Sequence, residues 1–392
     1  MGTKQQFTER CAEWMNTDRR RERCLSRKSS RWPTEEPDRS WNTHQTRARS
    51  PHIRDNYIAR PSATPWLERT TPTDTPSPGY GVQSMADQKD LDAHYTTMDK
   101  IFRLSLGEKG GYSGARFDGD FSMTLEQAQE KKHKFIMDNC NIKPGNKVLD
   151  IGCGWGAFID YLNRHGVSTT GVVLAKGQAD ACRKNGLNVH HMDSKKITPE
   201  TFGKFDAVCA MGSPEHLCSV EEYRAGKQEE IYKAYFKQVS DLLPVGGRFY
   251  CQTMVFGPNM VKFEDIKFGQ TNVWKNREKY SGEELMDLVC DVFPGSWLPY
   301  GKEGMIEPAK GHFKLVHEDS GRLDYIETIH RWTAAFNKFN LQKYGLYATL
   351  LPKLFSGDFR KWVRRYQIAP NLQVFEKLIF EHHRMVFEKV KD

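Results

Sequence analysis

The feature that most constrains the fold is a glycine-rich stretch at residues 148–156. Apolar residues surround Asp150, then Gly152, Gly154 and Gly156 follow, and apolar residues continue with helical spacing over 157–162. This order predicts a buried strand, a tight turn and the start of a helix. Glycines let the backbone approach a ligand closely, and the free N–H groups at a helix start hold pyrophosphate in dinucleotide sites.

The spacing of these glycines differs from the dinucleotide fingerprint, because they run G-x-G-x-G rather than G-x-G-x-x-G. Asp150 lies two residues before the first of them, and its carboxylate repels a pyrophosphate but suits a cation such as the amino group of a methionine moiety. The stretch therefore favours S-adenosylmethionine over NAD. The alternative at this point is an ordinary strand-to-helix turn that binds no ligand.

Strand-like and helix-like segments alternate after the glycine stretch. Strands are expected over 168–174, 188–192, 205–211 and 246–253, with helices from Lys176 and over 229–243. Such alternation predicts an α/β fold of the Rossmann-like type, in which helices cover both faces of a parallel sheet. Ligands of these folds bind at the carboxyl ends of the strands.

The alternation ends after Val255. Helical segments are expected around 282–293, a late strand over 313–317, and a mostly helical chain rich in aromatic and basic residues from Tyr325 to Lys391. We expect this part to form a lid over the strand ends. The predicted domain therefore runs over 85–392, with cap helices over 85–143, a cofactor-binding core over 144–255 and a lid with a helical acceptor region over 256–392. Among the cap helices, one is expected to start at Leu91, and a capping box of Thr124 and Gln127 is expected to open another.

Residues 1–84 differ from the rest of the chain. They contain 15 Lys and Arg against 10 Asp and Glu, and 8 of the 18 prolines, with little periodicity. This composition is typical of disordered segments. Three interpretations stay open: a targeting peptide, a flexible tail that binds an anionic partner, or a non-native extension before a true start at Met85. The segment is excluded from the predicted fold.

Charge and cysteine content limit the partners and the cellular compartment that we expect. The formal charge of +8 is compatible with peripheral contact with an anionic membrane surface, although a solvated basic surface is the slightly preferred interpretation. No aromatic and basic pattern typical of nucleic-acid binding is present, so no nucleic-acid partner is expected. Nine cysteines without metal-like spacing indicate a reducing, cytoplasmic location and no metal site. The oligomeric state is left open.

Several motifs, in this order, resemble the cyclopropane-fatty-acid synthase family of S-adenosylmethionine-dependent methyltransferases. The resemblance runs from about His94 to about Phe380. It is carried by Tyr112-Ser113, Leu125-Glu126-x-Ala128-Gln129-x-x-Lys132, Lys143-Pro144-Gly145, the stretch over 148–156, Glu215-His216 and Asp324-Tyr325. It implies a class I methyltransferase sheet with S-adenosylmethionine as the methyl donor.

The resemblance also implies residues for the cofactor. Tyr112 and Ser113 are expected to close over its methionine end, and Gln178 to replace the acid that often grips the ribose. Asp193 and Ser194 match a pair that lies beside the adenine. With the residues of the glycine stretch, the predicted cofactor site comprises Tyr112, Ser113, Asp150, Gly152, Gly154, Gly156, Gln178, Asp193 and Ser194.

The predicted catalytic residues are Glu215, Tyr325 and Gln252. In the resembling family, a bicarbonate held by a Cys, a Glu, a His and a Tyr removes a proton from a carbocation. Glu215 and Tyr325 match this set, whereas Gly114 stands at the Cys position and Gln252 at the His position. Use of bicarbonate is therefore doubtful here, and either Glu215 is itself the base or it holds a different group.

The acceptor is open between two classes. The aromatic-rich helical region favours C-methylation of an alkene-containing lipid or acyl chain, with or without ring closure. The altered anion site favours N- or C-methylation of a soluble small molecule. A third interpretation, a non-catalytic binder, is supported by the charged N-terminal segment alone. Residues 211–214 are expected to reshape the acceptor pocket.

Overall fold

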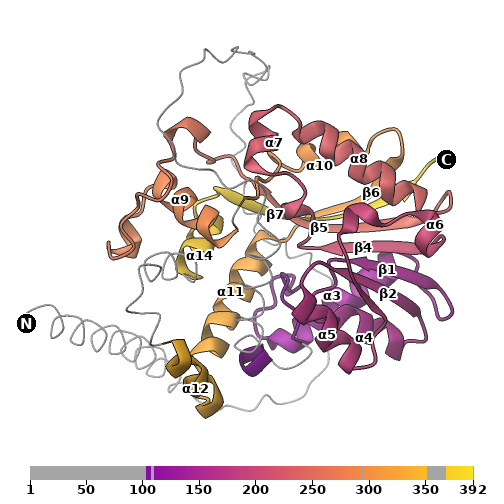
Figure 1. Ribbon diagram of the computed structural model, residues 1–392, viewed down its shortest axis with the longest axis horizontal. Helices are drawn as coiled ribbons and strands as arrows, with labels where there is room; N and C mark the ends of the chain where they lie inside the picture. The colour runs from indigo at the N-terminus through magenta and orange to yellow at the C-terminus, as the bar shows by residue number, and fades with distance from the viewer. Residues whose placement is uncertain (1–102, 107–109, 294, 351–367, 392) are drawn as a thin grey trace, which may run out of the picture. The chain divides into compact units, whose positions relative to one another are not determined.

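The computed structural model describes residues 103–106, 110–293, 295–350 and 368–391. Its centre is a seven-stranded sheet in the order β3-β2-β1-β4-β5-β7-β6, drawn in Figure 1. The strands are β1 Lys147–Ile151, β2 Ser168–Val173, β3 Val189–His191, β4 Ala207–Met211, β5 Arg248–Phe256, β6 Phe313–Ser320 and β7 Phe380–Lys389. Expectations for residues 1–84 and for a helix starting at Leu91 lie outside the described residues.

Helices separate the strands along the chain. The helices before and within the parallel part are α3 Leu125–Asn139, α4 Ala157–Arg164, α5 Lys176–Lys184, α6 Pro199–Phe202, α7 Val220–Arg224 and α8 Gln228–Asp241. Those that follow are α9 Gly282–Val292, α10 Glu303–Ala309, α11 Arg322–Asn337, α12 Leu341–Leu350 and α14 Ile368–Glu376. The predicted Rossmann-like α/β class is confirmed, and α3 begins at the capping box of Thr124 and Gln127 that its sequence predicts.

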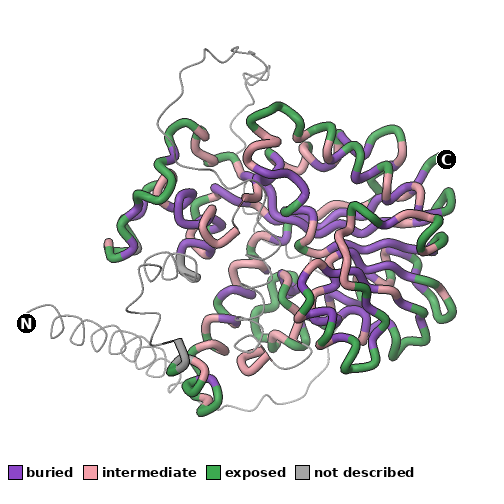
Figure 2. Tube along the Cα trace, viewed as in Figure 1, coloured by how far each residue is buried: buried purple, intermediate pink, exposed green. Residues whose placement is uncertain are grey.

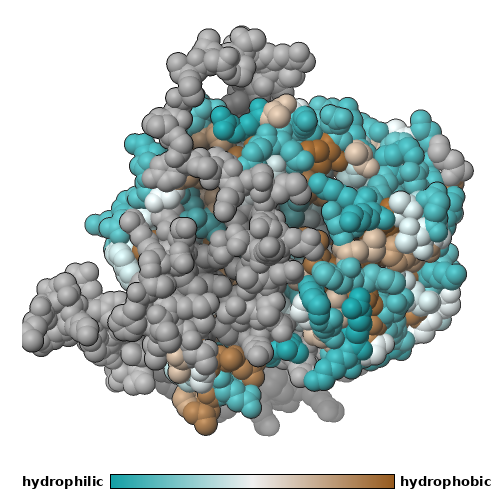
Figure 3. Space-filling view, in the orientation of Figure 1, coloured by the Kyte–Doolittle hydropathy of each residue, from teal (hydrophilic) through white to brown (hydrophobic). Residues whose placement is uncertain are grey.

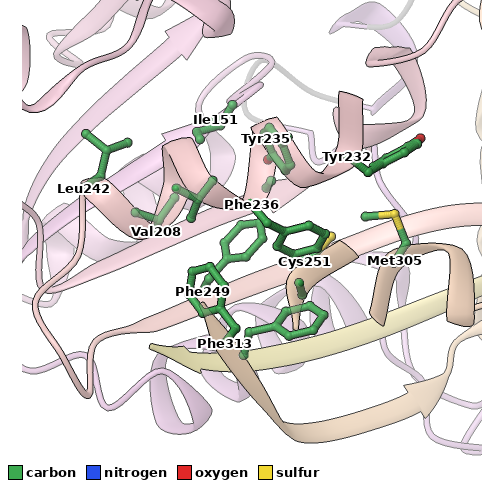
Figure 4. Packing of buried hydrophobic residues seen from close by; sticks show 14 of the residues in the cluster. Ile151, Val208, Tyr232, Tyr235, Phe236, Leu242, Phe249, Cys251, Met305 and Phe313 are labelled. Carbon is green, nitrogen blue, oxygen red and sulfur yellow. The ribbon is translucent and has the colours of Figure 1, made fainter. Parts of the chain in front are cut away.

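Alternate residues of the central strands face two different hydrophobic layers. Leu149 and Ile151 of β1 pack with α8 and α10, whereas Val148 packs with α3 and α4. Figure 4 shows the first layer, in which Phe236, Phe249 and Phe313 lie together. Figure 2 shows that the strands are buried along most of their length. Burial on both faces explains why these strands read as apolar runs.

The order of strands places a crevice beside β1. The chain runs outward from β1 to β2 and β3, then returns to place β4 on the other side of β1. Parallel sheets bind ligands at the carboxyl ends of strands where the order reverses in this way. The glycines at 152, 154 and 156 follow β1 and so lie at this point.

The end of the chain contains a strand that the sequence did not predict. Strand β7 has ten residues within a region that was expected to be mostly helical, and it pairs antiparallel with β5 and β6, whereas the predicted strands β1 to β5 pair in parallel. His383 and Arg384 of β7 are buried with acidic partners, the carboxylates of Glu318 and Asp319 in β6. These buried polar residues leave no apolar alternation that would predict a strand.

The segments after β5 build a second hydrophobic core. The predicted helix over 282–293 is present as α9, and it packs with α11 and α14 around Trp297 and Trp332. The predicted domain boundaries stay predictions.

Apolar side chains gather at the surface over α12 (Figure 3), where Phe339 and Leu341 are exposed. Contact with an anionic membrane stays a prediction. Among the described residues, no helix has the length and apolarity that a membrane crossing requires.

Candidate functional site

A cavity of about 250 Å³ opens at the carboxyl ends of β1 and β4. We call it the glycine-loop cavity, because residues 152–155 form one of its walls. Every residue of the predicted cofactor site lines it except Gly156. The structure thus brings together residues from the loop at 110–113, from β1, and from the segments that follow β2 and β3.

Two glycines of the loop have different tasks. Gly152 has a φ of +81°, and a side chain there would collide with Ser213 after β4. Gly156, at +79°, caps the start of α4, and a side chain there would collide with Leu187. Only glycine adopts such angles without strain and leaves room for these neighbours. Gly152 therefore shapes the cavity wall, whereas Gly156 lets the segment after α5 pack closely.

Asp150 places a buried carboxylate on the cavity. It is 2% exposed, and neither of its oxygens has a hydrogen-bond partner among the described residues. Burial raises the pKa of Asp150 to about 7, against the opposing effect of the nearby Lys132 ammonium. A buried acceptor without a donor is costly. The site therefore fits a ligand that brings a positively charged donor, as the amino group of a methionine moiety does.

The loop with Tyr112 and Ser113 is held by α3. The Gln129 side-chain nitrogen donates to the Ser113 carbonyl oxygen at 2.8 Å, and Lys132 Nζ donates to the Ser113 hydroxyl at 2.7 Å. Tyr112 stacks on Trp332 of α11, with ring centroids 4.6 Å apart. Gln129 and Lys132 are one helical turn apart, and this spacing is the sequence signal for a common task that the predicted site omitted.

The remaining cofactor predictions lie at the other end of the cavity. Gln178 is buried in the first turn of α5, and Asp193 and Ser194 follow β3. Asp193 Oδ1 accepts a hydrogen bond from the backbone N–H of Lys195 at 2.9 Å, so one carboxylate oxygen caps a short turn. Contacts of these three residues with ribose and adenine stay predictions.

Glu215 lines a second, apolar cavity of about 20 Å³. Its carboxylate accepts a hydrogen bond from the Met254 backbone N–H at 2.8 Å, and the other oxygen, Oε2, has no partner among the described residues. Burial raises the pKa of Glu215 to about 7. The other lining residues are almost all apolar: Met254, Phe256, Met286, Val289, Cys290, Phe293, Ser296, Trp297, Leu298 and Phe380.

The turn around Glu215 separates the two cavities. Ser213, His216 and Leu217 line the glycine-loop cavity, whereas Glu215 lines the apolar one. Met211, Gly212 and Ser213 also line the glycine-loop cavity, and the expected effect of residues 211–214 on the acceptor pocket stays a prediction. The carboxyl group of Glu215 thus belongs to the wall between two chemically different spaces.

Gln252 and Tyr325 do not line either cavity. The Gln252 side-chain nitrogen donates to the Gly114 carbonyl oxygen at 3.0 Å, and its oxygen accepts from the Tyr250 hydroxyl at 2.9 Å. A side chain at Gly114 would collide with the Tyr325 ring and would lie 3.1 Å from Cε1 of His382. The space of a side chain at the family's Cys position is therefore filled by a ring.

A partly buried network of ionic and hydrogen-bonding contacts holds the segment after Ser113. Asp118 donates its backbone N–H to Asp324 of α11, which also accepts from Arg384 of β7 at 2.8 Å. Asp319 accepts from Arg384 at 2.6 Å and from Arg116 at 2.8 Å. Although burial opposes it, the charge of Arg384 and hydrogen bonds from His317 and Arg116 lower the pKa of Asp319 to about 2. Because the end of the chain was expected to be helical, sequence reasoning missed Arg384.

Comparisons with known proteins agree with this geometry. A family model described as mycolic acid cyclopropane synthetase matches residues 82–357, well over half of the chain. Cyclopropane mycolic acid synthase 3 of Mycobacterium tuberculosis is 28% identical over 250 residues, which cover 62% of this chain and 80% of the relative.

Solved structures share the fold. Mycolic acid cyclopropane synthase CmaA1 complexed with SAH and CTAB gives a TM-score of 0.59 at 22% identity, over 78% of this chain and 99% of that chain. Coclaurine N-methyltransferase bound to N-methylheliamine and SAH gives 0.59 at 15% identity, over 79% and 84%. SAH is S-adenosylmethionine without its methyl group. By family match, fold and cofactor, the chain belongs to the mycolic acid cyclopropane synthetase family and is an S-adenosylmethionine-dependent methyltransferase.

Proposed function

We propose that this methyltransferase acts on an alkene carbon in the acyl chain of a lipid. The observation that carries the proposal is the apolar cavity that Glu215 lines, because its other walls are hydrocarbon and aromatic side chains from β5, α9 and the segment around Trp297. Such walls bind a hydrocarbon chain and offer little to a polar metabolite. The similarity to cyclopropane mycolic acid synthase 3, whose name specifies a lipid, supports the same class of acceptor.

The chain's residues suit the two needs of this reaction. When bound, S-adenosylmethionine supplies an electrophilic methyl group. An alkene that attacks this group becomes a carbocation, which then loses a proton to a base. Oε2 of Glu215 lies in the wall between the cavities without a described donor, so it can accept that proton. Loss of the proton from the new methyl group closes a cyclopropane, and loss from a neighbouring carbon leaves a branched alkene.

Bicarbonate is not part of the proposed mechanism, because the residues present do not fit it. Gly114 offers no side chain, and the Tyr325 ring fills the space beside it. The Gln252 amide already donates to Gly114 and accepts from Tyr250. We therefore assign proton removal to Glu215 and assign Gln252 to holding the loop at Gly114.

A soluble amine is the second candidate acceptor. The small volume of the apolar cavity, about 20 Å³, leaves room for little more than a water molecule, so a long chain must displace part of its wall. A carboxylate whose pKa burial raises to about 7 is also a suitable base for an ammonium group. This alternative predicts methyl transfer to the metabolite pool with unchanged lipids.

Lipid mass spectrometry tests the proposal. Cells rich in monounsaturated phospholipids express the protein or its Glu215→Gln variant, and acyl chains are compared. We expect a mass gain of one methylene on monounsaturated chains with the wild-type protein and none with the variant. Mild hydrogenation then separates the products, because a branched alkene takes up hydrogen and a cyclopropane does not. Unchanged lipids together with a methylated soluble product would contradict the proposal and support the amine alternative.

A further inference from the structure

Lys132 of α3 is a buried lysine in an unusual environment. It is 1% exposed, and among the described residues no carboxylate lies within ion-pair distance of it. Its ammonium donates to the Ser113 hydroxyl at 2.7 Å. Burial lowers the pKa of Lys132, and the Asp150 carboxylate works against that effect. Lysines are almost never buried without a charged partner, so this one needs an explanation.

The direction of this hydrogen bond determines what Ser113 can do. Burial lowers the pKa of Lys132 to about 7, and in its charged form the group has donors and no acceptor, so the Ser113 oxygen is then the acceptor. The hydroxyl hydrogen of Ser113 is then left to donate elsewhere, and no described residue accepts it. Because Ser113 lines the glycine-loop cavity, its hydroxyl offers that cavity a donor that is backed by a positive charge. An anionic oxygen is the best acceptor for such a donor.

The same cavity carries the complementary group. Asp150 lines it with two carboxylate oxygens that have no described donor. The positive charge of Lys132 favours the ionised form of this carboxylate. The cavity is therefore lined by both a carboxylate, that of Asp150, and a hydroxyl donor, that of Ser113, which is polarised by the positive charge of Lys132. A zwitterion that carries an ammonium and a carboxylate on one carbon matches both, and the methionine end of S-adenosylmethionine is such a zwitterion.

We propose that Lys132 is a cofactor-positioning residue. Its ammonium holds the Ser113 oxygen, so that the Ser113 hydroxyl donates to the methionine carboxylate, beside the ammonium that Asp150 is expected to bind. Lys132 and Asp150 together would select a ligand with an intact amino-acid end. This assignment holds for either class of acceptor, so it goes beyond the proposed function. It also gives the Gln129 and Lys132 spacing of α3 a common task, because both side chains hold Ser113.

A set of truncated ligands tests the assignment by calorimetry. SAH has both charged groups, its decarboxylated analogue keeps the ammonium alone, and 5′-methylthioadenosine has neither. We expect Lys132→Met to weaken SAH binding about tenfold to a hundredfold and to leave the other two ligands unchanged. Asp150→Asn should weaken SAH and the decarboxylated analogue. Lys131→Met is the matched control, because Lys131 is the next residue of α3 and pairs with Asp118 instead.

The ligand set separates a binding role from a structural one. Equal weakening of all three ligands by Lys132→Met would show that Lys132 only supports the fold, and unchanged SAH binding would also overturn the proposal. If the Lys132 variant does not fold, Ser113→Ala carries the test, because it removes the hydroxyl and leaves α3 intact. We expect it to abolish the preference for SAH over the decarboxylated analogue, and a preserved preference would contradict the assignment.

Discussion

Glu215 combines a functional position with a cost in stability. Its carboxyl group is 2% exposed, and burial raises its pKa from the ordinary 4.5 to about 7. Between these values the folded protein keeps a proton that the unfolded chain releases. The stability that Glu215 contributes is therefore fully present below pH 4.5 and is lost as the pH rises through about 7. The same ionisation produces the base that the proposed reaction needs.

Glu215→Gln is expected to separate these two effects. The amide keeps the hydrogen bond from Met254 but cannot ionise, so the variant should be more stable than the wild type by about 1–3 kcal/mol at pH 8. The gain should shrink towards pH 5. Turnover should fall by at least about a hundredfold. Urea unfolding at both pH values and single-turnover assays measure these changes.

The wild-type pH profile provides the control for this variant. If Glu215 acts as a base, kcat should rise with pH through about 7, where its carboxyl group ionises. SAH binding should be the same in both proteins, because Glu215 does not line the glycine-loop cavity. Retained turnover in the variant, or a loss of SAH affinity, would contradict the assigned role.

At the scale of elements, the position of the loop at residues 110–115 depends on helix α11. The backbone N–H of Ala115 donates to the Thr328 hydroxyl oxygen at 2.9 Å, and Thr328 donates in turn to the Asp324 carbonyl oxygen. Trp332, one turn further along α11, stacks on Tyr112. The loop with Tyr112 and Ser113 is therefore positioned by a helix that lies far away in the sequence.

Thr328→Val tests this dependence, because valine keeps the shape of threonine and removes its oxygen. The Ala115 N–H then lacks an acceptor, which should cost about 1–3 kcal/mol of folding stability. SAH should bind several-fold more weakly, because the loop with Tyr112 and Ser113 is less well fixed. Hydrogen exchange at Ala115, urea unfolding and calorimetry measure the three effects.

Thr333→Val is the matched control in the same helix. The Thr333 hydroxyl donates to the Ile329 carbonyl oxygen and makes no described contact with the loop. Its replacement should leave SAH affinity and exchange at Ala115 unchanged. Equal effects of the two substitutions would show that α11 acts through its general stability and not through the contact with Ala115.

At the scale of the whole molecule, the sequence predicts well what depends on near neighbours. The glycine turn with Asp150 and the capping box at Thr124 are local patterns, and both lie where they were expected. The need for a glycine at position 114 was not predictable, because it results from packing against Tyr325 of a helix that is distant in the sequence. Strand β7 was not predictable for the same reason. Its Arg384 can be buried because it donates hydrogen bonds to Asp319 of β6 and Asp324 of α11, which are distant in the sequence.

Two truncations test which ends of the chain the fold needs. The family match begins at residue 82 and ends at residue 357, so both residues 1–81 and strand β7 lie outside it. β7 nevertheless stands between β5 and β6, and its Met385, Val386 and Phe387 are buried in the core. A chain ending at Lys377 should lose cooperative unfolding and SAH binding, because β6 then lacks its partner and β5 presents an open edge.

A chain beginning at Met85 is the opposing case. The composition of residues 1–84 predicts no core of their own, so their removal should change the free energy of unfolding by less than about 0.5 kcal/mol. SAH affinity should also stay unchanged. Urea unfolding and calorimetry on both truncated chains decide the matter. An N-terminal truncation that unfolds would give residues 1–84 a role in the fold, and a C-terminal truncation that binds SAH normally would make β7 dispensable.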